Sequence, residues 1–165
     1  MEPRLNFMKL TPEPLKVMYG LEAYVRGSGL EHGLLELVKT RASQINGCAF
    51  CLDMHTQDAR AAGETEQRLY ALPAWREAPF YSERERAALA WAEAVTTLDG
   101  HVPDAVYEEV RPHFTEKELA DLTWAVVAIN GWNRLNVALR TPAGTYKPHL
   151  RSQMVAAITG AAVGG

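Results

Sequence analysis

Apolar and polar positions follow one another along most of this chain with the period of an α-helix. Ala88, Leu89, Ala92 and Val95, for example, fall on one face of a helix, and Leu119 begins a similar stripe further along. No segment shows the period of two that a half-buried strand requires. The sequence therefore predicts an all-α fold made of helices joined by short loops.

Capping and turn residues set the expected limits of these helices. Thr11 followed by Pro12 is typical of a helix start. Ser82 and Thr115 each precede a glutamate by three residues, which is the pattern of a capping box. Glycine and proline residues indicate where the helices end. The expected helices cover about residues 12–26, 31–45, 48–63, 66–72, 82–98, 103–112 and 115–141.

Length, composition and charge limit the number of domains and the kinds of partner that this chain can have. A chain of 165 residues favours a single domain, residues 1–165, which can bury a core without a disulfide or a metal ion. Apolar residues make up 47%, and the net charge of −3 gives no basic surface for a nucleic acid. There is no signal-like segment and no apolar stretch of about 18 residues. We therefore expect a cytoplasmic protein with no nucleic-acid partner and no membrane contact.

Both cysteines lie in the stretch NGCAFCLDMH, residues 46–55. Because Cys48 follows an Asn-Gly break, the pair is expected in the first turn of a helix, where free backbone N–H groups and the helix dipole lower the pKa of a thiol. The Cα atoms of Cys48 and Cys51 would be about 5 to 6 Å apart, within the range of a disulfide. His55, one turn after Cys51, is placed to exchange a proton with it.

This pattern has three interpretations. The pair is a redox dithiol with His55 as its base, or two buried thiols of a core helix, or part of a metal site. Cys48, Cys51 and His55 share the packed side of the helix, so the site is expected to be sheltered. A zinc site needs a fourth ligand, and the sequence has no second C-x-x-C motif and no H-x-x-x-H motif. We therefore favour redox chemistry and expect neither a metal ion nor a cofactor.

The stretch ELVKTRASQINGCAFCLDMH, residues 36–55, resembles the signature of the alkylhydroperoxidase D (AhpD)-like proteins of the carboxymuconolactone decarboxylase superfamily. The shared pattern is a glutamate, Glu36, then eleven residues and C-x-x-C-x-x-x-H. Similarity continues through DARAAGE at 58–64 and INGWNRLNVALRT at 129–141. The resemblance implies an AhpD-like core over about residues 31–141, a helical arm over about 1–27, a tail over 142–165, and a homotrimer or homohexamer.

The resemblance also implies a thiol-dependent peroxidase that reduces hydroperoxides. Cys51 would attack the peroxide and become a sulfenic acid, which Cys48 would resolve to a disulfide. Glu36 and His55 would relay the proton that leaves Cys51. In such proteins a dithiol or lipoylated protein reduces the disulfide again, and electrons can pass to a peroxiredoxin. We expect partners of these kinds.

Two positions add to this interpretation. Phe50 stands before the second cysteine, where AhpD proper often has a histidine, and this bears on the proton relay of Cys48 and on the reductant. Glu36 shares a polar face with Lys39, Thr40 and Ser43, and periodicity alone would leave that face in water. If Glu36 belongs to the site, the helix that begins at Cys48 or another subunit must cover this face and bring Glu36 to His55.

Two alternatives to a peroxidase follow from the same residues. One is a carboxymuconolactone decarboxylase-like enzyme that acts on a small lactone or another metabolite, although decarboxylases of the superfamily generally lack the cysteine pair. The other is a metal-binding or redox-sensing oligomer that signals through the state of Cys48 and Cys51.

Overall fold

The computed structural model describes residues 2–148, and its regular elements are helices, as the sequence predicts. Every expected helix is present, with ends that differ from the prediction by at most two residues. A short first helix and two 3-10 turns, at Leu72–Ala74 and Arg111–His113, were not predicted. The helices are α1 (Phe7–Leu10), α2 (Pro12–Arg26), α3 (His32–Ile45), α4 (Ala49–Ala61), α5 (Glu66–Ala71), α6 (Glu83–Thr97), α7 (Asp104–Val110) and α8 (Glu116–Leu139).

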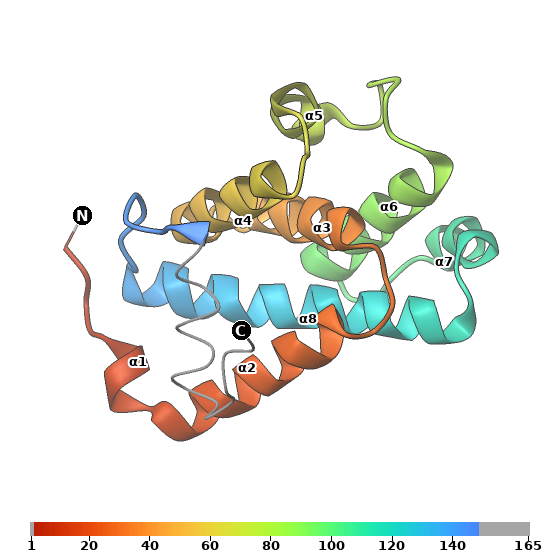
Figure 1. Cartoon of the computed structure of the whole chain (residues 1–165). Coiled ribbons are helices and arrows are strands. Elements are labelled where there is room, and N and C mark those ends of the chain that lie inside the picture. Colours follow the sequence, from red (N-terminus) through yellow and green to blue (C-terminus); the bar gives the residue numbers. More distant parts are fainter. Residues whose placement is uncertain (1, 149–165) are drawn as a thin grey trace.

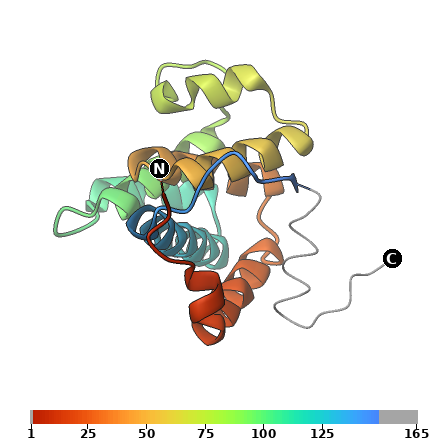
Figure 2. The ribbon, with the colours of Figure 1, turned by 90° about the vertical axis from the view of Figure 1, so that its left-hand side faces the viewer.

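The long helix α8 runs through the middle of the molecule, with α2 against one side and α3 and α4 against the other (Figure 1). In the view turned by 90°, α8 is seen nearly end-on between α2 and the pair formed by α3 and α4 (Figure 2). Helix α6 packs against both α3 and α8, and α7 packs against α6. This arrangement leaves α3 surrounded by α4, α6 and α8.

The buried apolar residues form separate clusters, two of which include residues of α8. One cluster joins α2, α3, α6 and α8 through residues such as Val25, Val38, Ala88 and Val126. A different cluster contains both cysteines, and its other buried members are Phe7, Leu15, Ala42, Ile129 and Trp132. The expected N-terminal arm therefore contributes apolar side chains to the cluster that holds the cysteines.

Two sequence expectations concern the ends of the chain and the membrane. Of the expected tail, residues 149–165 lie outside the described residues. Within residues 2–148, no helix is both long enough and apolar enough to cross a bilayer.

Candidate active site

The turn between α3 and α4 sets the position of the cysteine pair. Gly47 has a φ of 65°, a backbone conformation that glycine adopts at little cost. Its N–H donates to the carbonyl of Gln44, and the N–H of Cys48 donates to the carbonyl of Ser43 at 3.0 Å. These two bonds form a Schellman motif that ends α3. The next helix starts at once, so Cys48 is the N-cap residue of α4 rather than its first helical residue.

Cys48 and Cys51 are joined by a disulfide, and their Cα atoms are 5.3 Å apart, as the first-turn position predicts. Each sulfur has its own hydrogen-bond donor. The backbone N–H of Cys51 donates to Sγ of Cys48 at 3.3 Å, and the side-chain amide of Asn136 donates to Sγ of Cys51 at 3.6 Å. Both cysteines are buried, with exposed fractions of 1% and 0%. The site is therefore sheltered, as expected.

His55 and Glu36 form a buried pair next to the cysteines. Nδ1 of His55 lies 2.7 Å from Oε2 of Glu36, and both side chains are at most 2% exposed. His55 stands one turn after Cys51 on the same buried side of α4. The carboxylate therefore fixes the orientation of the imidazole ring, as second partners of histidine commonly do. The periodicity argument that placed Glu36 in water is wrong, because α4 covers this part of α3.

Three different helices cover the polar face of α3. Glu36 meets α4, whereas Nζ of Lys39 lies 2.6 Å from Oε2 of Glu22 on α2. Oγ of Ser43 accepts from Nδ2 of Asn133 on α8 at 3.0 Å. Three of the four polar side chains on this face are thus satisfied by buried partners instead of water, whereas Oγ1 of Thr40 is buried without a hydrogen-bond partner among residues 2–148. The expectation that this face is covered and brings Glu36 to His55 is confirmed.

A second buried carboxylate, Asp58, lies next to the pair of Glu36 and His55, and it is not among the site residues predicted from the sequence. One ligand atom each of Glu36, His55 and Asp58 lie within 4.8 Å of one another. The hydroxyl of Tyr146 donates to Oδ1 of Asp58 at 2.7 Å, so the segment after α8 covers this end of α4. Asp58 follows Cys51 by seven residues, and this spacing places it on the packed side of the helix. That signal was sufficient to find it.

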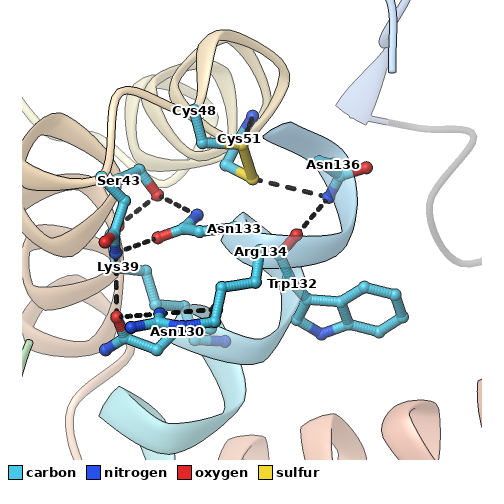
Figure 3. The surroundings of a disulfide bond; sticks show 10 residues. Lys39, Ser43, Cys48, Cys51, Asn130, Trp132, Asn133, Arg134 and Asn136 are labelled. Atoms are coloured by element: carbon cyan, nitrogen blue, oxygen red, sulfur yellow. Dashed lines mark hydrogen bonds between the residues drawn. A yellow bond between two sulfur atoms is a disulfide. The ribbon is translucent and has the colours of Figure 1, made fainter. Parts of the chain in front are cut away.

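Three asparagines of α8, Asn130, Asn133 and Asn136, interrupt an otherwise apolar stretch. From the sequence alone they could either face water or form hydrogen bonds where two helices cross. Asn46, at the end of α3, donates to Oδ1 of Asn130 and of Asn133, and Asn136 reaches the sulfur of Cys51. Figure 3 shows them as a row along α8 that faces α3 and the disulfide. They therefore connect α8 to the cysteine turn.

His32 lies on the solvent side of the Glu36 carboxylate. It is half exposed, as a residue next to a helix start is expected to be, and its Nε2 lies 3.7 Å from Oε1 of Glu36. One oxygen of Glu36 therefore faces the buried imidazole of His55, and the other faces an imidazole that reaches water. Together these groups can take a proton from the interior and pass it toward solvent.

Comparison with known proteins agrees with this geometry. The model of the carboxymuconolactone decarboxylase family matches residues 12–94, which include Glu36, both cysteines and His55. The uncharacterized protein YdfG of Bacillus subtilis is 46% identical over 140 residues, which are 84% of this chain and 95% of that relative.

Solved structures show the same architecture. A protein of unknown function from Agrobacterium tumefaciens, suggested to be the antioxidant defence protein AhpD, has a TM-score of 0.84 and 44% identity over 88% of this chain and all of its own. The debrominase Bmp8 has a TM-score of 0.76 at 22% identity, over 84% of this chain and 75% of its own, and shows the shared fold alone. The chain therefore belongs to the carboxymuconolactone decarboxylase family, as an AhpD-like member.

Proposed function

We propose that this protein is a thiol-dependent peroxidase that reduces hydroperoxides through Cys48 and Cys51, with His55 and Glu36 carrying the proton. The supporting observation is that a buried, disulfide-bonded cysteine pair at the start of α4 is followed one turn later by a buried histidine that is hydrogen-bonded to a buried glutamate. A base within one turn of a thiol favours the thiolate, which is the nucleophile in peroxide reduction.

The proposed reaction has two steps that balance in atoms and electrons. In the first, His55 takes the proton of the Cys51 thiol, and the thiolate attacks the distal oxygen of the hydroperoxide. The O–O bond breaks, a sulfenic acid forms on Cys51, and the leaving alkoxide takes the proton from His55 to become an alcohol. In the second, Cys48 attacks Sγ of Cys51, and the S–O bond breaks with release of water. An external dithiol then supplies the two electrons that reduce the disulfide.

A buried base also needs a route by which protons exchange with water. Glu36 and His55 have almost no exposed surface, so they depend on a neighbour for this exchange. His32 is the neighbour that meets this need, because it contacts Oε1 of Glu36 and has an exposed side chain. We propose that protons enter and leave through His32.

The burial of the disulfide bears on its reductant. Because neither sulfur is exposed, a dithiol or lipoyl-type reductant has to reach Cys48 after a local opening of the first turn of α4. Phe50, in this turn, lies against the same apolar cluster as the cysteines. We also propose that a peroxiredoxin receives electrons from the pair, and that the chain works as a homotrimer or homohexamer in the reducing cytoplasm.

A steady-state assay tests the proposal. The consumption of an organic hydroperoxide is followed with a small dithiol reductant for the wild type, Cys51→Ser and Cys48→Ser. We expect the wild type to turn over and Cys51→Ser to be inactive, and we expect Cys48→Ser, mixed with the hydroperoxide in the absence of reductant, to consume one equivalent and stop at the sulfenic acid. Equal rates for the wild type and Cys51→Ser would contradict the proposal and favour the chemistry of a small metabolite instead.

A metal site is the second candidate, and the cluster of Glu36, His55 and Asp58 favours it. Against it, the same side chains already bond to one another and to Tyr146, and an ion would have to displace those contacts. Metal analysis of protein purified without a chelator separates the two candidates. The metal hypothesis predicts about one equivalent per chain, and the peroxidase proposal predicts no stoichiometric metal.

A further inference from the structure

Asn136 has a place in the site that no motif predicts. Its side chain is 4% exposed, and Nδ2 donates both to Sγ of Cys51 at 3.6 Å and to the carbonyl of Trp132 at 2.9 Å (Figure 3). A carbonyl oxygen accepts only, so the bond to Trp132 requires the amide nitrogen on this side. The orientation of the amide is thereby fixed, with an N–H directed at the sulfur of Cys51.

Stability alone does not explain an amide at this position. Oδ1 of Asn136 is buried and has no hydrogen-bond donor among residues 2–148. An unpaired buried acceptor destabilises the folded state, whereas an apolar side chain next to Cys51 and Trp132, which belong to an apolar cluster, would carry no such penalty. The neighbouring Asn133, in contrast, donates to Ser43 and accepts from Asn46. Asn136 thus differs from a purely structural member of the row.

We propose that Asn136 is a catalytic residue whose amide N–H stabilises the thiolate of Cys51. A hydrogen bond to a charged acceptor is stronger than one to a neutral acceptor, so the amide favours the thiolate over the thiol. It also distinguishes the two cysteines, since Cys48 receives its bond from the backbone. The inference rests on the proposed function in taking Cys51 as the attacking thiol.

Stabilising a thiolate has two opposite effects on its reactivity. The thiolate becomes more abundant near neutral pH, but each thiolate becomes a weaker nucleophile. On a logarithmic scale, nucleophilicity falls by about half as much as the thiolate fraction rises. Below the pH at which the thiol is fully ionised, the gain in thiolate fraction is therefore larger than the loss in nucleophilicity. The loss of Asn136 should therefore slow Cys51 at neutral pH, and at high pH, where both thiols are ionised, it should make Cys51 faster.

The test measures the alkylation of Cys51 by iodoacetamide as a function of pH, with Cys48→Ser as the parent so that Cys51 is the only thiol. Serine is also a good N-cap, so it preserves the start of α4. We expect Asn136→Leu to shift the pH profile upward and to slow alkylation at pH 7 about tenfold, the effect of one charge-assisted hydrogen bond. At high pH the two profiles should cross, because the fully ionised thiolate of the variant is the stronger nucleophile.

Two further variants keep the outcome decisive. Asn130→Ala is the matched control, because it removes an amide of the same row that does not contact sulfur, and its profile should match that of the parent. If Asn136→Leu does not fold, Asn136→Asp keeps the shape and replaces the N–H by a carboxylate, which should shift the profile further upward. A folded Asn136→Leu or Asn136→Asp with the profile of the parent would overturn the inference.

The assay contains no hydroperoxide, so it separates this inference from the proposed function. A wild type without peroxidase activity whose alkylation profile still depends on Asn136 would refute the peroxidase and leave the role of the amide intact. An active peroxidase whose profile does not depend on Asn136 would refute the role of the amide alone.

Discussion

The burial of the Glu36 carboxylate is unfavourable for the stability of the fold. Transfer of a carboxylate from water into the interior is unfavourable by several kcal/mol, and one hydrogen bond to His55 offsets only part of this. Buried titratable groups with a specific partner cluster at functional sites. Its second oxygen faces His32, whose side chain reaches solvent although the carboxylate itself does not.

We predict that Glu36→Gln reduces the rate of hydroperoxide reduction about 100-fold, because an amide can still bond to His55 but cannot stabilise its protonated form. The measurement is the steady-state rate at pH 7, with far-UV circular dichroism to verify folding. Glu22→Gln is the matched control. It removes a buried carboxylate of α2 that pairs with Lys39, and Lys39 lies on α3 as Glu36 does. Both variants should lose stability, and similar losses of activity would contradict a specific role of Glu36.

The site could be predicted from the sequence only where spacing along one helix carries it. Cys48, Cys51 and His55 share a face of α4, and this follows from their positions alone. Glu36 was nominated by family resemblance, because its partner lies on another helix. Asn136 could not be found in either way, since its contact with Cys51 depends on how α8 crosses α4.

At the scale of elements, the capping boxes account for much of the success of the sequence prediction. Ser82 and Thr115 both make the reciprocal bonds of a capping box, and α6 and α8 start where these bonds require. The short α1 escaped prediction because four residues are too few to show a period. The polar face of α3 was misjudged because periodicity describes one helix and not the three helices that cover it.

The capping box of α8 leads to a prediction about pH. The backbone N–H of Thr115, followed by the Arg84 guanidinium, lowers the pKa of the Glu118 carboxyl from 4.5 to about 2. A carboxyl with a lowered pKa stabilises the fold at pH values above 4.5, and this contribution disappears as the pH falls toward about 2. Glu118→Gln should therefore unfold more easily than the wild type at pH 7 but not at pH 2.

Urea unfolding of both proteins at pH 7, 4 and 2 measures this difference. Glu116→Gln is the matched control, because it removes a carboxylate from the same turn without touching the capping box. A difference between the wild type and Glu118→Gln that stays constant from pH 7 to pH 2 would rule out the proposed contribution of its charge.

At the scale of the whole molecule, two large apolar side chains on one side of α8 are exposed. Trp124 is 50% and Val127 is 45% exposed, and they lie one turn apart. Tyr24 on α2 is 51% exposed, and its hydroxyl bonds at 2.8 Å to Asp121, which precedes Trp124 by three residues on α8. Apolar groups that gather in this way often mark a contact with another protein.

We predict that these residues form part of the contact between subunits of the proposed homotrimer or homohexamer. Light scattering coupled to size-exclusion chromatography should give the mass of three or six chains for the wild type. Trp124→Glu should shift the protein toward the monomer, because a carboxylate would be buried without a partner. Tyr70→Glu, at an exposed aromatic residue on α5, is the control and should leave the mass unchanged. A monomeric wild type would contradict the prediction.

The central claim is that Cys51 reduces a hydroperoxide and that Cys48 resolves the product, and a single-turnover titration tests it most directly. The protein is reduced, freed of reductant and mixed with one equivalent of an organic hydroperoxide, and free thiols and intact mass are then measured. Both thiols should disappear together, an intramolecular disulfide should form and one equivalent of alcohol should be released. Thiols that survive the hydroperoxide, or a Cys51→Ser protein that consumes it as fast as the wild type, would rule out this mechanism.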